Sequence, residues 1–137
     1  MPGTASRTVE CRRWRVIRLL LVDDEVSVRK GLRMQLELEP DVDVVGEAGD
    51  GETALRIAPE LAPDVILMDI RMKGMDGITA TRALRDSYPG AAVVVLSLQD
   101  DQATKDLASH AGARAFVGKH EAATQLITTI RNVAPAV

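Results

Sequence analysis

Short, almost wholly apolar runs recur along the chain, and segments with helical spacing separate them. The runs at 16–22, 65–68 and 93–96 consist mainly of Val, Ile and Leu. Runs of this length indicate strands that are buried on both faces, as in a parallel sheet. A β-branched segment at 42–48 and a short segment at 114–117 predict two further strands.

Helices are predicted between these strands, because apolar residues recur there every three or four positions until a proline or glycine intervenes. They are expected at 28–38 before Pro40, at 51–58 before Pro59 and Pro63, at 78–88 before Pro89, at 100–109 before Gly112, and at 121–133. Alternating strands and helices predict an α/β fold of flavodoxin-like type. This is a doubly wound five-stranded parallel sheet, (βα)5, with strand order 2-1-3-4-5.

The length of 137 residues suits one domain with a sizeable core. We expect a flexible leader at 1–14, the domain at 15–134 and a tail at 135–137. The net charge of −3 gives no electrostatic case for nucleic-acid binding by this chain. Cys11 is the single cysteine, which excludes an intramolecular disulfide and is compatible with a cytoplasmic location.

No apolar stretch reaches the roughly 20 residues that a membrane-spanning helix needs, so no membrane association is expected. Arg12 and Arg13 before the first apolar run superficially resemble an export signal. That run is interrupted by Arg18 and ends at Asp23, whereas a signal needs a continuous apolar region. We therefore interpret it as the first strand.

Three of the predicted strands end on residues that are capable of chemistry. Asp23 and Asp24 follow the first strand, Asp69 ends the third and Ser97 ends the fourth. Because parallel strands present their carboxyl ends at one edge, these groups are expected to converge. Carboxylates held close together repel one another and favour a divalent cation, and an all-oxygen ligand set suits Mg²⁺. Lys119, after the fifth strand, adds the ammonium group that phosphoryl transfer requires.

Each of these residues also has a simpler structural interpretation when it is taken alone. An Asp at a strand end commonly caps a helix or a turn. Lys119 could be a solvated surface lysine, Ser97 could cap the next segment, and Phe116 could be an ordinary core residue. Their joint occurrence in this order favours the chemical interpretation.

Together the motifs resemble the response-regulator receiver domains of two-component signalling, over about residues 16–133. The resemblance rests on Leu-Val-Asp23-Asp24-Glu25, on Leu-Met-Asp69-Ile-Arg-Met with Met75-Asp76-Gly77, on Ser97 and on Lys119. It implies that Asp69 accepts a phosphoryl group from a sensor histidine kinase and forms an aspartyl phosphate. It also implies a Mg²⁺ site, with Mn²⁺ as an alternative ion. The implied metal ligands are Asp23, largely through water, Asp24, Asp69 and the backbone carbonyl of Arg71.

The same resemblance implies how the phosphoryl group is sensed. Ser97 and Lys119 would bind its oxygens, Phe116 would be the switch aromatic that moves inward, and Arg71 and Gln99 would influence the phosphoryl lifetime. The responsive surface, which would control homodimerisation or an output partner, is expected to be formed by the fourth helix, fifth strand and fifth helix at 100–109, 114–117 and 121–133.

The segment Ala-Gly-Ala-Arg before the fifth strand and the lack of proline after Lys119 are most similar to receivers of NarL/LuxR-type transcription regulators. Those regulators carry a helix-turn-helix output domain, through which DNA would be bound. Since the sequence ends at Val137, we expect either a truncated regulator or a single-domain one. A receiver is not expected to be an enzyme, although it assists its own phosphorylation and dephosphorylation.

Four positions depart from the usual receiver pattern, namely Lys73, Leu98, Gly118 and His120. Leu98 is expected to narrow access to the side chain of Asp69. Gly118 is expected to make the orientation of the Lys119 side chain less fixed, that is, to loosen the aim of this lysine. These departures leave open a degenerate receiver that acts as a constitutive protein-interaction module. A metal-dependent phosphatase of similar topology is a further candidate, but such enzymes place an acidic residue where this chain has Arg71.

Overall fold

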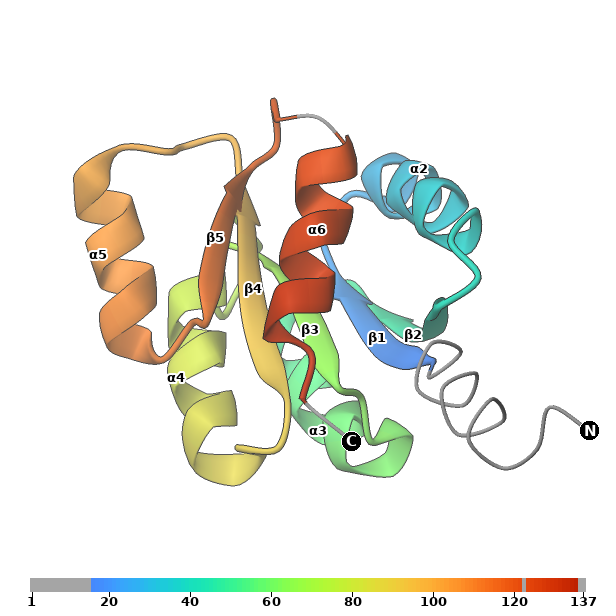
Figure 1. Ribbon diagram of the computed structural model, residues 1–137. Coiled ribbons are helices and arrows are strands. Elements are labelled where there is room, and N and C mark those ends of the chain that lie inside the picture. The colour runs from blue at the N-terminus through green and yellow to red at the C-terminus, as the bar shows by residue number, and fades with distance from the viewer. Residues whose placement is uncertain (1–15, 122, 136–137) are drawn as a thin grey trace, which may run out of the picture.

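The computed structural model describes residues 16–121 and 123–135. Within these residues one parallel sheet of five strands has the order β2-β1-β3-β4-β5 (Figure 1). The strands are β1 (Ile17–Val22), β2 (Val42–Ala48), β3 (Val65–Asp69), β4 (Ala92–Ser97) and β5 (Ala115–Gly118). The predicted fold and strand order are confirmed. The leader predicted at 1–14 and residues 136 and 137 of the predicted tail lie outside the described residues.

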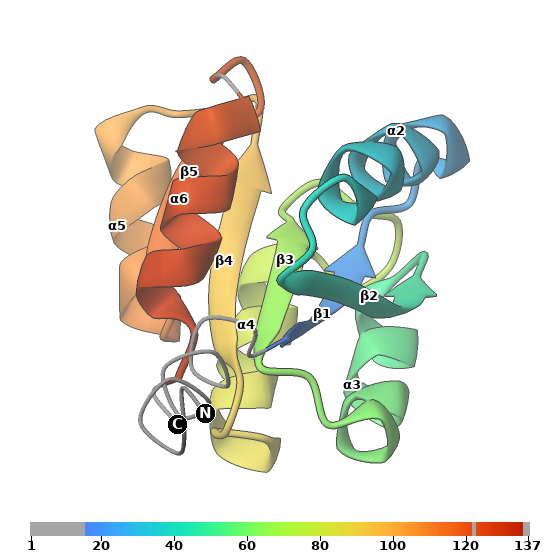
Figure 2. The same cartoon turned by 45° about the vertical axis from the view of Figure 1, so that its right-hand side comes forward.

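Helices cover both faces of the sheet. The described helices are α2 (Val26–Glu37), α3 (Gly51–Leu61), α4 (Gly77–Ser87), α5 (Gln102–Ala111) and α6 (Ala123–Val133). Helices α2 and α6 lie on one face, and α3, α4 and α5 lie on the other (Figures 1 and 2). This three-layer arrangement explains why the central strands are apolar apart from Arg18 in β1 and from Asp69 and Ser97 at the ends of β3 and β4. No helix in the described part of the chain is long and apolar enough to cross a bilayer.

Successive side chains of each central strand enter different cores. Leu19 and Leu21 of β1 pack with α2 and α6, whereas Leu20 and Val22 pack with α3, α4 and α5. Strands β3 and β4 repeat this alternation, and all of their residues are buried. The two cores hold the sheet rigid, so the residues at the carboxyl ends of its strands have fixed positions.

Aspartate side chains begin three of the helices. Asp50, Asp76 and Asp101 each accept a hydrogen bond from the backbone N–H three residues later, over 2.7, 2.8 and 3.0 Å. These bonds satisfy N–H groups that have no partner within the helix. The predicted helix end at Gly112, whose φ is 109°, is confirmed.

Most predicted helix limits differ from the observed ones by one to three residues. Helix α3 does not end before Pro59 but continues to Leu61, and its C-cap is Ala62, whose φ is 49°. Proline has no N–H, so Pro59 makes no helical bond to the carbonyl of Leu55, but the N–H of Ala62 still donates to Ala58 at 2.9 Å and closes the last turn. The helix predicted at 100–109 is α5, which begins at Gln102 rather than at residue 100 because Asp101 is its cap and not its first residue.

Gly77 allows the first turn of α4 to lie directly beside the end of β3. Its N–H donates to the carbonyl oxygen of Ile70 at 2.8 Å. A Cβ at this position would collide with the backbone carbonyl of Asp69 and would lie 2.8 Å from the Cα of Ile70. Backbone atoms cannot turn aside as a flexible side chain can, so this close approach requires glycine.

We predict that Gly77→Ala lowers the free energy of unfolding by about 1–3 kcal/mol, because the methyl group forces β3 and α4 apart. Gly31→Ala is the matched control, since Gly31 lies within α2 and an added Cβ there meets no atom within 4 Å. That control should raise stability by about 1 kcal/mol through helix propensity. Urea unfolding of both variants checks the prediction, and equal effects of the two substitutions would contradict it.

Candidate functional site

Three carboxylates gather at the carboxyl edge of the sheet. Val22 of β1 is paired with Met68 of β3, so the residues that follow them, Asp23 and Asp69, lie side by side. Asp24 completes the group, and one carboxylate oxygen from each residue lies within 4.8 Å of the others. Asp23 and Asp69 are only 1% and 7% exposed. The cluster predicted from the strand ends is therefore present.

Lys119 reaches this cluster from the end of β5. Its Nζ lies 3.0 Å from Oδ2 of Asp23 and 3.3 Å from Oδ1 of Asp69. Its backbone N–H donates to the carbonyl oxygen of Ser97 at 2.8 Å, which fixes the start of the side chain against β4. Lys119 is thus a partner of the acidic cluster and not a solvated surface lysine.

Burial and neighbouring charges shift the pKa values of Asp69 and Lys119. Burial raises the pKa of Asp69, and the neighbouring charge of Asp23 adds to this, although Lys119 and the backbone N–H of Arg71 favour the ionised form. Burial alone would lower the pKa of Lys119, but its bonds with Asp23 and the charge of Asp69 outweigh burial and raise that pKa. The ammonium group therefore stays charged.

The donor set fits a divalent cation with hard-oxygen preference. Three carboxylates face one ammonium group, which leaves negative charge uncompensated at the cluster. The carboxylate of Asp24 is only partly buried and accepts one long hydrogen bond from the backbone N–H of Lys73, at 3.4 Å. Oxygen ligands with excess negative charge and one solvent-accessible member suit Mg²⁺, which retains several of its waters.

Ser97 and Phe116 lie on the opposite side of Asp69 from Asp23-Asp24-Glu25, the acidic loop that follows β1. Ser97 ends β4, is 2% exposed, and its Oγ accepts a hydrogen bond from the N–H of Gln99 at 3.0 Å. Its hydroxyl therefore does stabilise the next turn, while its hydrogen can still be donated to another group. Phe116 in β5 is half-buried against the second core, and Nζ of Lys105 lies 5.9 Å from its ring centre. The inward motion of this ring stays a prediction.

Arg71 and Gln99 bridge the loops that follow β3 and β4. The guanidinium of Arg71 donates to Oε1 of Gln99 at 3.1 Å, and both side chains are exposed. The two residues predicted to influence the phosphoryl lifetime thus contact each other at the rim of the site. The role of the Arg71 carbonyl as a metal ligand stays a prediction.

His120 occupies the space that the missing side chain of Gly118 leaves. A Cβ on Gly118 would lie 2.7 Å from Cε1 of the His120 ring, whose Nε2 lies 3.3 Å from Oδ2 of Asp100. The expectation that Gly118 loosens the aim of Lys119 is not supported, because the ammonium and the backbone N–H of that lysine are both bonded. Leu98 is 76% exposed, so its side chain lies mostly in solvent.

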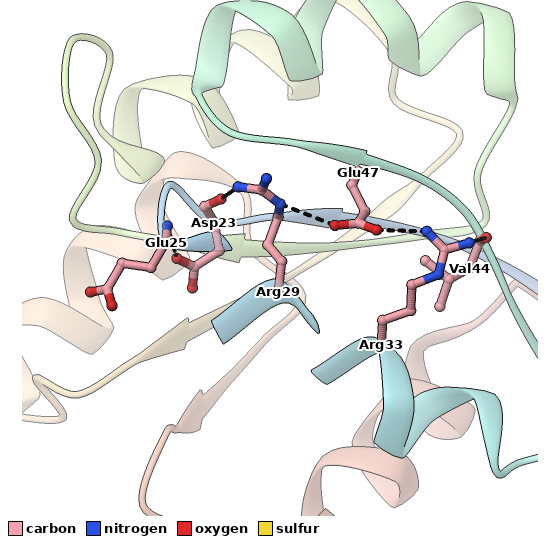
Figure 3. A network of polar contacts seen from close by, with 6 residues as sticks. All are labelled: Asp23, Glu25, Arg29, Arg33, Val44 and Glu47. Carbon is pink, nitrogen blue, oxygen red and sulfur yellow. Dashed lines mark hydrogen bonds and ion pairs between the residues drawn. The ribbon is translucent and has the colours of Figure 1, made fainter. Parts of the chain in front are cut away.

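The sequence patterns did not identify a network of charged residues behind the acidic loop. Figure 3 shows Arg29 between Asp23 and Glu47, with Arg33 on the other side of Glu47. Arg29 donates to the backbone carbonyl of Asp23 and, over 3.0 Å, to Oε1 of Glu47. Arg33 donates to Oε2 of Glu47 at 2.6 Å. The contacts of Glu47 with Arg29 and with Arg33 join residues that are 18 and 14 positions apart, so no local sequence pattern predicts them.

Comparison with known proteins places this site in a recognised family. The family model described as the response regulator receiver domain matches residues 19–131. The transcriptional regulatory protein LiaR of Bacillus subtilis (strain 168) is 44% identical over 118 residues, which cover 85% of this chain and 55% of LiaR. The nitrate/nitrite response regulator protein NarP of Escherichia coli (strain K12) is 38% identical over 113 residues, covering 82% and 53%. The chain therefore spans about half the length of these curated relatives.

A solved structure supports the same assignment. The two-component response regulator of the LuxR family from Aurantimonas sp. SI85-9A1 superposes with a TM-score of 0.83 at 34% sequence identity. The match covers 86% of this chain and 84% of that one. The relatives and this structural neighbour both agree with the predicted similarity to NarL/LuxR-type receivers.

The raised pKa of Asp69 predicts that Asp69→Asn stabilises the protein in EDTA at pH 7, by about 1 kcal/mol. The folded state bears the cost of an ionised, buried carboxylate above the raised pKa, and Asn removes that charge. This cost is absent below the ordinary aspartate pKa of about 4, so the advantage of Asn should shrink as the pH falls to that value. Urea unfolding at pH 7 and pH 4 checks both parts; an unchanged or lower stability at pH 7 would contradict the prediction.

Proposed function

Because this chain belongs to the response regulator receiver domains of two-component systems, we propose that it is a signalling switch activated by phosphorylation of Asp69. The proposal rests on one observation above all. Lys119 contacts both Asp69 and Asp23, so the acceptor, a counter-charge and the metal-binding carboxylates share one site. We take residues 15–134 as the receiver domain, with a leader before it and a short tail after it.

The acceptor step is a transfer between two nucleophiles. A carboxylate oxygen of Asp69 attacks the phosphorus of a phosphohistidine on a sensor histidine kinase, and the bond from phosphorus to the imidazole nitrogen breaks. The nitrogen keeps the electron pair, and an aspartyl phosphate remains on this chain. The small phosphodonor acetyl phosphate would react in the same way, with acetate as the leaving group.

Asp23, Asp24 and Asp69, with the carbonyl of Arg71, would hold Mg²⁺ or Mn²⁺. When bound, the ion neutralises charge on the phosphoryl oxygens during transfer. Lys119 supplies a second positive charge, because its ammonium group already lies within 3.3 Å of the acceptor carboxylate. A groove lined by Asp24, Arg71 and Lys73 lies beside this edge, and a donor would approach Asp69 from there.

The added phosphoryl group would attract Ser97 and Lys119 and so change the surface formed by α5, β5 and α6. The hydroxyl of Ser97 can donate, and Phe116 in β5 can move inward into the space that the hydroxyl leaves. Leu107 on α5 is 55% exposed, which suits a surface that contacts a second copy or an output partner. Since relatives include transcriptional regulators, we propose a cytoplasmic role in transcription regulation, with DNA bound by an output domain and not by this domain.

The second candidate is a degenerate receiver, which would bind partners without being phosphorylated. The departures at Lys73 and Leu98 favour it, because both lie next to loops that border the site. In either case the chain is not expected to turn over external substrates. Two experiments separate the candidates.

We expect acetyl phosphate with Mg²⁺ to add one phosphoryl mass to the wild type and none to Asp69→Ala. The reason is that Asp69 is the acceptor in the proposed reaction. Asp76→Ala is the control, since Asp76 is exposed and caps α4, and it should still be labelled. Intact-protein mass spectrometry gives the result, and labelling that persists without Asp69 would contradict the assignment.

Beryllofluoride, a mimic of the phosphoryl group, should bind the wild type only when Mg²⁺ is present. The carboxylates repel an anion unless a cation offsets their charge. Fluorine NMR during a Mg²⁺ titration would show the bound signal appear with the metal and disappear with EDTA. Absence of any bound signal at saturating Mg²⁺ would favour the degenerate receiver.

A further inference from the structure

We infer that Arg29 is a positioning residue that aims Asp24 at the metal, an inference that rests on the proposed function. Arg29 lies in the first turn of α2 and its side chain is only 17% exposed. It donates to the backbone carbonyl of Asp23, which belongs to the peptide group that joins Asp23 to Asp24. Holding this peptide group fixes the direction in which Asp24 leaves the acidic loop.

Asp24 needs such support more than its neighbours do. The side chain of Asp23 is held by the N–H of Glu25 at 2.9 Å and by Lys119 at 3.0 Å. Asp69 lies at the end of a buried strand and is paired with Lys119. Asp24 has one long bond, 3.4 Å, from a loop N–H, so the orientation of its carboxylate depends mainly on its backbone.

Glu47 fixes Arg29 in turn. The two side chains are 3.0 Å apart, and Glu47 lies on β2 next to Ala48, whose carbonyl oxygen accepts the N–H of Asp23 at 3.1 Å. The end of β2 thus holds the acidic loop twice, once directly through Asp23 and once through Glu47 and Arg29. The planar guanidinium can bond two acceptors at once, which a lysine ammonium cannot do with the same fixed geometry.

Arg33 provides a matched comparison for Arg29. It also lies on α2 and also pairs with Glu47, at 2.6 Å, and it further donates to the carbonyl of Val44. Within the described residues it makes no bond to the acidic loop. Replacing either arginine with methionine removes one positive charge and one bond to Glu47, but only the change at Arg29 releases the peptide group before Asp24.

In Arg29→Met, loss of the positive charge and loss of the positioning contacts would change the Mg²⁺ affinity in opposite directions. Removing a positive charge near the carboxylates favours cation binding. Loss of positioning weakens it, as replacement of residues that orient metal ligands commonly does by about 10- to 100-fold. Weaker Mg²⁺ binding after Arg29→Met therefore cannot be caused by the change in charge.

The test is a Mg²⁺ titration by calorimetry of the full chain as wild type, Arg29→Met, Arg33→Met and Arg29→Lys, with urea unfolding of each. We expect Arg29→Met to bind Mg²⁺ about 10- to 100-fold more weakly than the wild type, Arg33→Met to bind like the wild type, and Arg29→Lys to stay weakened. Labelling of Arg29→Met by acetyl phosphate should recover when Mg²⁺ is raised to saturation, which a general loss of structure would not allow.

Each outcome of the titration either supports or contradicts the positioning role of Arg29. Equal Mg²⁺ affinities of Arg29→Met and Arg33→Met would overturn the inference while leaving the proposed function intact. If Arg29→Met does not fold, Arg29→Lys decides, and wild-type affinity in that variant would overturn the inference. A wild type that binds no Mg²⁺ at all would instead contradict the proposed function, and the inference with it.

Discussion

Mutual repulsion among buried carboxylates is the constraint on which the rest of this structure depends. Asp23 and Asp69 are nearly inaccessible to water, and Asp24 lies beside them. Holding like charges together at the edge of a sheet costs free energy, which the two apolar cores and the ammonium of Lys119 must offset. Proteins commonly accept such a cost at a functional site, because the same uncompensated charge attracts a cation.

The parallel sheet makes this arrangement possible. Apart from Arg18 near the start of β1, the central strands are apolar up to their carboxyl ends, so the polar residues found at those ends lie at one edge of the sheet. The pairing of Val22 with Met68 places Asp23 level with Asp69, and the pairing of Asp69 with Leu96 places Ser97 one residue further along the same edge. Strand register, rather than any local motif, therefore determines which side chains meet.

Much of the fold could be predicted from the sequence, since buried strands and their ends are local features. The runs at 16–22, 65–68 and 93–96 marked the central strands, and the residues directly after them are Asp23, Asp69 and Ser97. Pro59 was misinterpreted because a proline in the last turn of a helix looks, in sequence, like one that ends it.

The pairing of Arg29 with Glu47 could not be predicted for a different reason. Arg29 lies in a helix with several other charged residues, and Glu47 lies in a strand at the edge of the sheet. Their contact depends on how α2 packs against β2, and a single sequence carries no signal of that packing. Charged residues on a helix usually form a solvated face, so a partly buried arginine such as Arg29 is not expected from the sequence.

The two sides of the site differ in how firmly they are held, and this difference bears on how the switch would work. On the β1 side, the acidic loop is fixed through its backbone by Ala48 and Arg29. On the β4 side, Leu98 and Gln99 are exposed, and the loop is held by bonds at the surface. A phosphoryl group on Asp69 would meet a rigid metal site on one side and a yielding loop on the other. Under the proposed function, the structural change would therefore spread toward α5 and β5, while α2 and β2 keep the metal ligands in place.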